Sequence, residues 1–336
     1  MTDTDFESVS RRQQLRILSR VAHDIAAQYP IKPTSIAVRN FGFNATFIIT
    51  AGRGRRYGLR INVNSARSRA NLLAETAWLE AIAINTSVVA PQPIANRDGA
   101  SITSVTAAGR TFDSVMYHWI DGRTVGDRFG RPTAAQLGAT MAMLHDHSPS
   151  LRLPKAAKFP KLTSLLWNQP DRLHSNGTPL NKVQLRVIDR VISDLQPVLN
   201  IVLKHDQHRP IHADLHAGNL LRHAGQLRII DFDDSGIGVP AQDIGVAAFY
   251  EDAKPSFLEP LLEGYCSVRP LPHVSDDVIH ALMAHRNLVL LNDLLGTQTA
   301  DMREMIPKYI RRSTARFRHY RDTGRFKLDL PGLEPL

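Results

Sequence analysis

The residues best suited to chemistry lie between His212 and Asp233. Asp214 is followed five residues later by Asn219, and a short stretch with a turn separates this pair from Asp231. An aspartate can accept the proton of a hydroxyl group, while a carboxylate and an amide oxygen can hold Mg²⁺, which prefers hard oxygen ligands. Phosphoryl transfer needs positioning and charge neutralisation more than covalent chemistry from the protein. The segment therefore predicts magnesium-dependent phosphoryl transfer to a hydroxyl, with Asp214 as base and Asn219 and Asp231 as metal ligands.

The order and spacing of these residues add weight to that interpretation. The pattern His-x-Asp-x-x-x-x-Asn, followed after a turn by Asp-Phe, matches the catalytic loop and metal-binding segment of protein kinases. The competing interpretation is a buried turn with polar caps, because Asp, His and Asn are common in turns. Six specified positions in the correct order, placed between apolar strands, favour the catalytic interpretation.

The first 120 residues predict a strand-rich unit that could hold a nucleotide over this segment. Apolar residues at helical spacing predict an amphipathic helix over 8–28 and a second helix over 71–84. Alternating apolar and polar residues predict strands within the ranges 35–49, 57–63, 101–106 and 112–120. The turn that contains Gly42 and Asn44 could cover phosphates, although an ordinary hairpin explains a single glycine equally well.

The third of these strands carries a basic residue where protein kinases place a phosphate-binding lysine. No lysine occurs between Lys32 and Lys155, so Arg60 must hold the phosphates if the chain is a kinase. Glu75 lies on the apolar face of the helix over 71–84, and a buried carboxylate needs a partner. We therefore predict a pair between Arg60 and Glu75, for which a purely structural salt bridge is the alternative.

A break at Asp121-Gly122 separates this unit from a mainly helical remainder. The stretch 116–122 would then be a hinge between two lobes, residues 1–122 and 123–336. Within the second lobe, Thr133 and Gln136 predict a capping box at the start of a helix, and Pro197 should end or kink the following one. The fold class is α+β, an N-terminal sheet lobe with a helix followed by a larger helical lobe.

Composition sets broad limits on the protein. The single cysteine, Cys266, excludes an intramolecular disulfide and a cysteine metal cluster, which fits a cytoplasmic protein, and the polar N-terminus does not resemble a signal peptide. No apolar run is long enough to span a bilayer. The net charge of +9 comes mostly from scattered arginines, so we do not expect nucleic acid as a partner. The one basic cluster, 308–321, is expected to be a solvated helix face. No feature indicates an oligomeric state.

Several blocks of the sequence resemble the aminoglycoside phosphotransferase family, which includes choline, homoserine and related small-molecule kinases and some bacterial protein kinases. The strongest blocks are 212–219, 229–234 and 242–244, and the resemblance extends from about Ile36 to Phe249. The resemblance implies a protein-kinase-like two-lobe fold that uses ATP and Mg²⁺. It implies that the His118 carbonyl and the Ile120 amide contact adenine, and that His212 and Asp243 brace the catalytic loop.

This sequence departs from the family pattern at three positions. Ala213 replaces the arginine of His-Arg-Asp protein kinases, so we expect no control by a phosphorylated activation loop. Arg60 replaces the frequent lysine, and Asp233 replaces the glycine of Asp-Phe-Gly. The leading hypothesis is a kinase that acts on a hydroxyl of a small molecule. A serine/threonine protein kinase and an inactive nucleotide-binding module are the alternatives. Arg60 is the only feature that favours the inactive module.

The acceptor itself is not identified by any motif. Segments 145–205 and 250–300 should select it, and their candidate residues are Trp167, Asp171, His174, Glu251, Asp252, Tyr265, His285 and Asp293. Aminoglycosides are cations and need an acidic pocket, whereas the basic chain favours an anionic or neutral acceptor.

Overall fold

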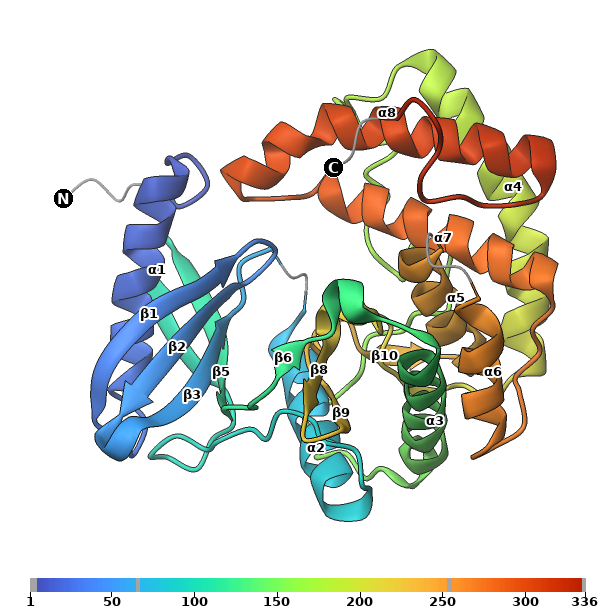
Figure 1. Ribbon diagram of the computed structural model, residues 1–336. Helices are drawn as coiled ribbons and strands as arrows, with labels where there is room; N and C mark the ends of the chain where they lie inside the picture. Colours follow the sequence, from blue (N-terminus) through green and yellow to red (C-terminus); the bar gives the residue numbers. More distant parts are fainter. Residues whose placement is uncertain (1–4, 65–66, 253–255, 334–336) are drawn as a thin grey trace.

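The computed structural model describes residues 5–64, 67–252 and 256–333, and it has two parts (Figure 1). An antiparallel sheet with one helix forms the N-terminal part, and a larger, mainly helical part follows. This arrangement agrees with the expected α+β class. The exact boundary after residue 122 stays a prediction.

The N-terminal part is a five-stranded antiparallel sheet in the order β1-β2-β3-β5-β4. Its strands are β1 (Pro33–Phe41), β2 (Ala45–Ala51), β3 (Arg55–Ile61), β4 (Thr103–Ala107) and β5 (Arg110–His118). Helix α1 (Arg11–Ala26) packs against one face of the sheet, where Leu18 and Ile25 join Phe47 and Ile49 in one apolar cluster. Burial alternates along β2, as expected for a half-buried strand.

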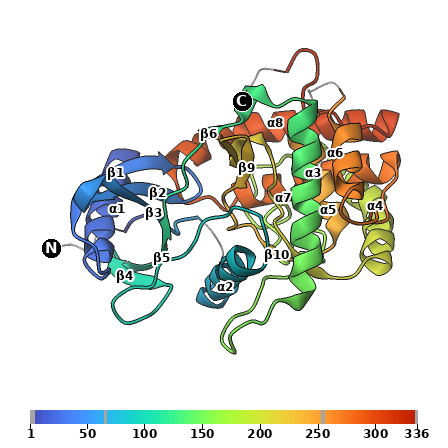
Figure 2. The ribbon, with the colours of Figure 1, turned by 60° about the horizontal axis from the view of Figure 1, so that its bottom comes forward.

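Helix α2 (Arg69–Asn85) belongs by its packing to the second part. Trp78 on this helix is fully buried, and its ring meets the Phe159 and Phe232 rings edge-on at centroid distances of 5.8 and 5.4 Å. Figure 2 shows α2 between the sheet and the helical part. Because Phe232 follows Asp231 directly, this packing joins α2 to the segment predicted to bind metal.

The C-terminal part is built from six helices and short strands in the described residues. The helices are α3 (Arg131–His147), α4 (Lys182–His205), α5 (Pro240–Glu251), α6 (Leu258–Cys266), α7 (Asp276–Leu294) and α8 (Ala300–Thr323). The strands are β6 (Arg123–Thr124), β7 (Arg209–Ile211), β8 (Leu220–His223), β9 (Gln226–Ile229) and β10 (Gly236–Gly238). The hairpin β8–β9 lies between Asn219 and Asp231, where the sequence predicted a turn.

The segment before α8 ties the two parts together. The Gln298 backbone nitrogen donates to the Asn64 side chain at 2.6 Å, and its carbonyl accepts from the Gln14 side chain of α1 at 3.2 Å. Arg11 and Asp301 also form an ion pair here. In Figure 1 this end of α8 approaches α1. The cleft between the two parts is therefore closed at this side by specific contacts.

Three local predictions were wrong or incomplete. Helix α3 begins at Arg131 with Gly130 as its N-cap, so Thr133 lies inside the helix, where its hydroxyl accepts from Arg222 instead of capping. Helix α4 continues through Pro197, which does not end it. The C-terminal basic cluster is not one solvated face: its members Arg312 and Arg316 are buried, and they contact Asp329 and Asn287.

No helix in the described ranges is long and apolar enough to cross a bilayer.

Helices α3 and α6 cross at two glycines. A Cβ on Gly138 would lie 1.9 Å from the Leu261 carbonyl oxygen, and a Cβ on Gly264 would lie 1.9 Å from the Ala135 carbonyl oxygen. Contacts this short with backbone cannot be relieved by a side-chain rotation. The close approach of the two helices therefore requires glycine at both positions.

Gly138→Ala should destabilise the fold, although alanine usually stabilises a helix relative to glycine by about 1 kcal/mol. Separating the two helices should cost about 1–3 kcal/mol, the usual cost of overpacking a core. Urea unfolding measures the difference. The control is Gly52→Ala, where a Cβ meets nothing within 4 Å. Equal stability of the two variants would contradict the packing argument.

Candidate active site

A buried carboxylate from α5 holds the catalytic loop in place. Asp243 is fully buried, and its side-chain oxygens accept from the backbone nitrogens of Ala213 at 2.6 Å and His212 at 3.1 Å. One of these oxygens also bonds the His145 ring at 2.9 Å. Two amides and an imidazole satisfy a charge that burial would otherwise make costly. Asp243 thus lies where the family resemblance places a bracing residue.

His212 connects the loop to the strand that ends before Asp231. Its Nε2 donates to the Ile230 carbonyl at 3.2 Å, and its Nδ1 accepts from the Asp214 backbone nitrogen at 3.2 Å. This pattern requires a neutral ring with the proton on Nε2. Burial lowers the pKa of His212, which agrees with the neutral form. The imidazole therefore fixes the relative positions of the two aspartate segments.

Two residues of the site have left-handed backbone conformations. Ala213 has φ 66° and Asp231 has φ 69°, values that cost a non-glycine residue about 1–3 kcal/mol. At Ala213 the strained turn is held by the bond to Asp243. Ala213 directly precedes Asp214, and the carboxylates of Asp214 and Asp231 line the same cavity. Such strain is typical of functional segments that the surrounding structure holds in place.

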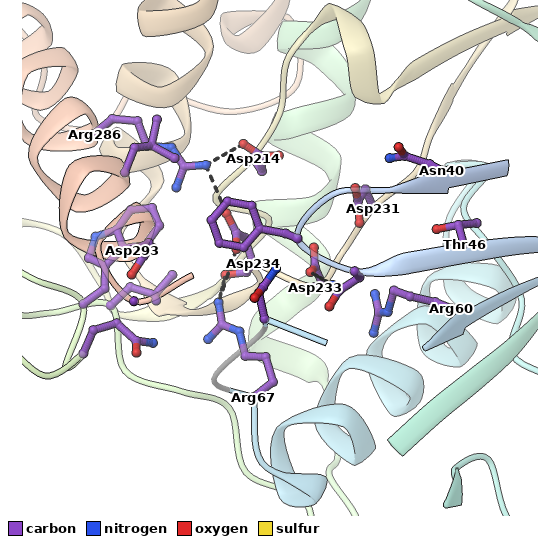
Figure 3. A pocket seen from close by; sticks show the side chains of 18 of the residues that line it. Asn40, Thr46, Arg60, Arg67, Asp214, Asp231, Asp233, Asp234, Arg286 and Asp293 are labelled. Carbon is purple, nitrogen blue, oxygen red and sulfur yellow. Dashed lines mark hydrogen bonds and ion pairs between the residues drawn. The ribbon is translucent and has the colours of Figure 1, made fainter. Parts of the chain in front are cut away.

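The carboxylate of Asp214 is held by neighbours on both oxygens, and Figure 3 shows the contact with Arg286. Arg286 of α7 donates to Oδ1 at 2.6 Å, and the Asn219 amide donates to Oδ2 at 2.8 Å. His216 lies 3.4 Å from Oδ2. Burial alone would raise the pKa of Asp214, but Arg286, His216 and His212 together outweigh it and hold the pKa below its usual value. Asp214 is therefore ionised at neutral pH.

Asn219 lies between the loop and the second aspartate segment. Its amide nitrogen donates to the Asp214 carbonyl at 2.9 Å as well as to the Asp214 carboxylate. Its backbone carbonyl accepts from Ile230 at 3.0 Å. Because the nitrogen is used within the loop, the side-chain oxygen is the atom left for a cation.

The Asp231 and Asp233 pair carries negative charge that the protein only partly compensates. Burial raises the pKa of Asp231 well above its usual value, and the neighbouring Asp233 raises it further. The Asn44 amide donates to Asp233 at 2.6 Å, and Arg60 offers the nearest positive charge. Two carboxylates that repel each other in a buried site fit a divalent cation.

The donor set fits Mg²⁺ better than a metal that needs a complete protein cage. Among the described residues, no group of three or more His, Cys, Asp or Glu side chains is arranged to hold a metal. Mg²⁺ commonly takes one or two carboxylates from the protein and fills its other positions with water and phosphate oxygens.

The predicted pair between Arg60 and Glu75 is formed and has a third member. Arg60 donates to Glu75 at 2.6 Å, and the Tyr117 hydroxyl donates to the other carboxylate oxygen at 2.9 Å. All three side chains are buried. Desolvation lowers the pKa of Arg60, but Glu75, Tyr117 and Asp233 together raise it more, so the guanidinium stays charged. The triad fixes a cation from β3 at the wall of the cleft.

Two adjoining cavities share Arg60, Asp231 and Thr46. The first is mostly charged; it is lined by Asn44, Arg67, Trp167, Arg172, Asp214, Asp233, Asp234, Tyr250, Arg286 and Asp293, among others. The second is more apolar; it is lined by Gly58, Leu79, Tyr117, His118, Trp119, Ile120, Leu221 and Phe232, among others. His118 and Ile120 thus lie at a cavity, as the hinge prediction required. Gly42 lines neither cavity, and its carbonyl accepts from Asn64.

The sequence analysis missed the charged chain across the first cavity. Arg286 bridges Asp214 and Asp234, at 2.6 and 3.0 Å, and Arg67 donates to the Asp234 carbonyl at 2.8 Å (Figure 3). Burial raises the pKa of Asp234 to about 6. Tyr250, 3.4 Å from Arg286, completes this group. No spacing pattern could have singled out Arg286, which lies 72 residues from Asp214.

Of the eight acceptor candidates, only Trp167 and Asp293 line the first cavity. The other six have structural contacts elsewhere. Asp171 and His174 bond each other at the surface, Glu251 accepts from Ala217, Asp252 accepts from Leu328, Tyr265 bonds His145, and His285 donates to Leu165.

The family model described as the phosphotransferase enzyme family matches residues 38–276, and the chain belongs to this family. It is therefore a phosphotransferase. Amicoumacin kinase from Bacillus subtilis (strain 168) is 25% identical over 195 residues, which are 57% of this chain and 56% of that protein. The chain thus matches about half the length of this curated relative.

Solved structures with similar folds cover nearly the whole chain. A microcompartment-associated aminopropanol kinase is 23% identical, with a TM-score of 0.74, and the match covers 93% of this chain and 100% of that one. Amicoumacin kinase hAmiN, in complex with AMP-PNP, Ca²⁺ and Ami, is 20% identical, with a TM-score of 0.72 and coverage of 91% and 96%. These likenesses confirm the fold expected from the sequence.

Glu75→Gln should lower the free energy of unfolding by about 3–5 kcal/mol, because it leaves the Arg60 guanidinium buried without an anion. Glu80→Gln, an exposed position on the same helix, is the matched control and should change little. Urea unfolding of both variants measures the difference. If they are equally stable, the buried pair does not contribute as described.

The acid stability of the protein should depend on His285. Burial lowers the pKa of His285 to about 4, from 6.5 in the unfolded chain, and its Nε2 donates to the Leu165 carbonyl at 2.8 Å. Because the unfolded state takes up the proton first, stability is lost as the pH falls from about 6.5 to about 4. His285→Gln cannot titrate and should lose less stability over this window, by about 3 kcal/mol. The exposed His223→Gln control should follow the wild type; if the His285 variant does so too, the argument fails.

Proposed function

We propose that the protein is an ATP-dependent kinase that transfers the γ-phosphate to a hydroxyl group of a small molecule. One observation carries the proposal: Asp214, Asn219 and Asp231 come together where a charged cavity adjoins a second cavity lined by the hinge. A site of this kind can hold a nucleotide on one side and an acceptor on the other. Membership of the phosphotransferase family supports the reaction class.

The hinge-lined cavity is the proposed site for the nucleotide base. Its apolar walls, among them Leu79, Leu221 and Phe232, suit a flat aromatic ring. The His118 carbonyl and the Ile120 amide are the proposed contacts to adenine. We place the division between the nucleotide-binding lobe and the acceptor-binding lobe at residue 122, directly after these contacts.

Arg60 and the turn before β2 are proposed to contact the phosphates. Glu75 and Tyr117 hold the Arg60 guanidinium at the point where the two cavities meet. Arginine remains charged at all physiological pH values and can contact two phosphate oxygens at once. Asn44 lies beside Asp233 near this point, while Gly42 supports the turn through its bond to Asn64.

Asn219 and Asp231 are the proposed ligands for Mg²⁺. The Asn219 side-chain oxygen is free of the bonds that hold its nitrogen, and Asp231 carries charge that its surroundings disfavour. When bound, Mg²⁺ neutralises phosphate charge and orients the transferred group. Asp233 stands next to this pair, held by Asn44.

Asp214 is proposed to accept the proton of the acceptor hydroxyl. Its low pKa makes it a weak base, but the loose transition state of phosphoryl transfer asks for orientation of the nucleophile more than for basicity. Asn219 and Arg286 hold the carboxylate in one orientation, and His212 and Asp243 hold the backbone beneath it. The chain thus places one fixed acceptor atom beside the phosphoryl donor.

A small acceptor is favoured by the walls of the charged cavity. Leu162 and Trp167 from the loop after α3 and Leu290 from α7 enclose the side away from the nucleotide. The kinases similar to this chain are named for aminopropanol and amicoumacin, both small molecules. A serine/threonine protein kinase is the competing function and is tested by the same experiment.

Asp214→Asn should lower kcat by about 10²–10⁴-fold, the usual contribution of a general base. The measurement is ATP turnover with a panel of hydroxylated metabolites, antibiotics and generic protein substrates. Asp322→Asn, an exposed position on α8, is the matched control. Full activity of the Asp214 variant would show that the site is assigned wrongly. Stimulation by protein substrates alone would favour the protein-kinase alternative.

Binding of Mg-ATP should be retained in Asp214→Asn, which separates binding from catalysis. A nucleotide present well above its dissociation constant should stabilise both proteins by about 2 kcal/mol or more, measured by thermal shift. No shift at millimolar nucleotide would count against a kinase. Binding without turnover by any acceptor would favour an inactive nucleotide-binding module.

A further inference from the structure

The end of the charged cavity that lies away from Asp231 and Asp233 contains one arginine whose bonding capacity is largely unused. Arg172 lines this cavity from the loop 164–174. Its nearest carboxylate is that of Asp293, at 3.9 Å, which is beyond hydrogen-bond distance. The other two arginines of this end, Arg67 and Arg286, donate hydrogen bonds to Asp234 or its backbone.

The Arg172 guanidinium packs against the backbone of Gly296. A Cβ on Gly296 would lie 2.2 Å from the Arg172 Nε and 2.6 Å from its central guanidinium carbon. The guanidinium therefore rests directly on the glycine backbone, in space that any other residue would fill. Since Gly296 has an ordinary backbone conformation, the turn itself does not require glycine. The glycine is explained by the position of the arginine.

The loop that carries Arg172 is fixed on both sides. The buried Asn292 accepts from the Arg172 backbone nitrogen at 2.9 Å and donates to the Pro170 carbonyl at 3.0 Å. Asp171 accepts from the backbone nitrogen of Leu173 at 3.0 Å. The backbone that carries Arg172 is therefore held in place before any ligand binds, which reduces the entropic cost of binding.

The same loop carries a second side chain with an unused hydrogen-bond donor. Trp167 lines the cavity and is 4% exposed, and its indole nitrogen has no hydrogen-bond partner among the described residues. A buried donor without a partner costs about 1–3 kcal/mol. Its backbone is also strained, with φ 52°, and the next residue, Asn168, has φ 57°. The loop is therefore strained at Trp167 and Asn168, and it holds the Trp167 ring as a wall of the cavity.

The charges around this end balance before an acceptor arrives. Three guanidinium groups and three carboxylates line this end of the cavity; they belong to Arg67, Arg172 and Arg286 and to Asp214, Asp234 and Asp293. Figure 3 labels all of these residues except Arg172. An acceptor that is only a cation would be repelled by Arg172 and would leave its donors unused. An acceptor with an oxyanion uses the Arg172 guanidinium, which can only donate hydrogen bonds.

We propose that the phosphoryl acceptor carries, besides its hydroxyl, a carboxylate or phosphate group that Arg172 binds. This inference rests on the proposed kinase function, because the hydroxyl must lie at Asp214. It adds the class of acceptor, an anionic or zwitterionic hydroxy compound, to the reaction proposed above. Arg172 is then a specificity residue that contacts the acceptor and takes no part in the transfer.

The experiment compares acceptors that differ in one group only. The probes are 2-amino-4-hydroxybutanoate, 3-aminopropan-1-ol, which lacks its carboxylate, and 4-hydroxybutanoate, which lacks its amine. A fourth probe, 4-hydroxybutyl phosphate, distinguishes a phosphate from a carboxylate. Each is tested for phosphorylation by the wild type, Arg172→Gln, Gly296→Ala and the control Arg190→Gln, which changes an exposed arginine on α4.

The wild type should use at least one anionic probe about tenfold or more better in kcat/KM than 3-aminopropan-1-ol, as expected for a charge-assisted contact. Arg172→Gln should abolish this preference by raising KM. Gly296→Ala should do the same while Arg172 is still present, because the new Cβ displaces its guanidinium. A preference for 3-aminopropan-1-ol that Arg172→Gln leaves unchanged would overturn the proposal and leave the kinase function standing.

Direct binding decides the question if none of these small probes is phosphorylated. The full-length protein is loaded with Mg²⁺ and a non-hydrolysable ATP analogue, which occupies the γ-phosphate position, and is titrated calorimetrically with 4-hydroxybutanoate, 4-hydroxybutyl phosphate and inorganic phosphate. At least one should bind the wild type, about tenfold more weakly after Arg172→Gln. Equal binding, or no binding of any probe, overturns the oxyanion site. Failure of the analogue itself to bind counts against the kinase function instead.

Discussion

The arrangement of the active site depends on the bonds that Asp243 makes from the first turn of α5. Without this buried carboxylate, the backbone nitrogens of His212 and Ala213 would lack partners, and nothing would hold Ala213 in its left-handed conformation. That conformation sets the direction in which the next residue, Asp214, leaves the loop. The bond from His145 connects the same carboxylate to α3. Core packing of three separate segments thus determines the position of the side chain that we propose as the base.

A second constraint is electrostatic, and it organises the cavity in front of the loop. Carboxylates and guanidinium groups alternate there, with Arg286 between Asp214 and Asp234 and Arg67 beyond (Figure 3). Each charge is stable in this partly desolvated cavity only because its neighbour has the opposite sign. At the other side, Asp231 and Asp233 lack such compensation, which is the condition that a cation would relieve. The cleft is therefore divided into a side that suits a metal and phosphates and a side already balanced for an acceptor.

What could be predicted from the sequence was local. The strands of the N-terminal sheet and helices α1 and α2 follow from periodicity and turns, and the Arg60–Glu75 pair follows from a carboxylate on an apolar helix face. The capping box at Thr133 was wrong because Gly130 and Pro132 begin that helix earlier. The basic cluster was misread because charges that look solvated on one helix can be buried by another segment, as the contact of Arg316 with α7 shows.

The residues that sequence reasoning missed have a common property. Arg286, Tyr117 and His145 reach the site from elements far along the chain, and each is recognisable only by what it contacts. A pattern in one segment carries no information about which distant side chain will approach it. The motif therefore identified the reaction class, whereas the proposed acceptor site lies between α7 and the loop 164–174, whose joint geometry no spacing encodes.

The most direct test of the central claim is a crystal structure with Mg²⁺ and a non-hydrolysable ATP analogue. The account predicts the base in the cavity lined by His118 and Ile120, the metal between the Asn219 side-chain oxygen and Asp231, and the terminal phosphate facing Asp214. A nucleotide bound elsewhere, or a metal that contacts neither Asn219 nor Asp231, would contradict it.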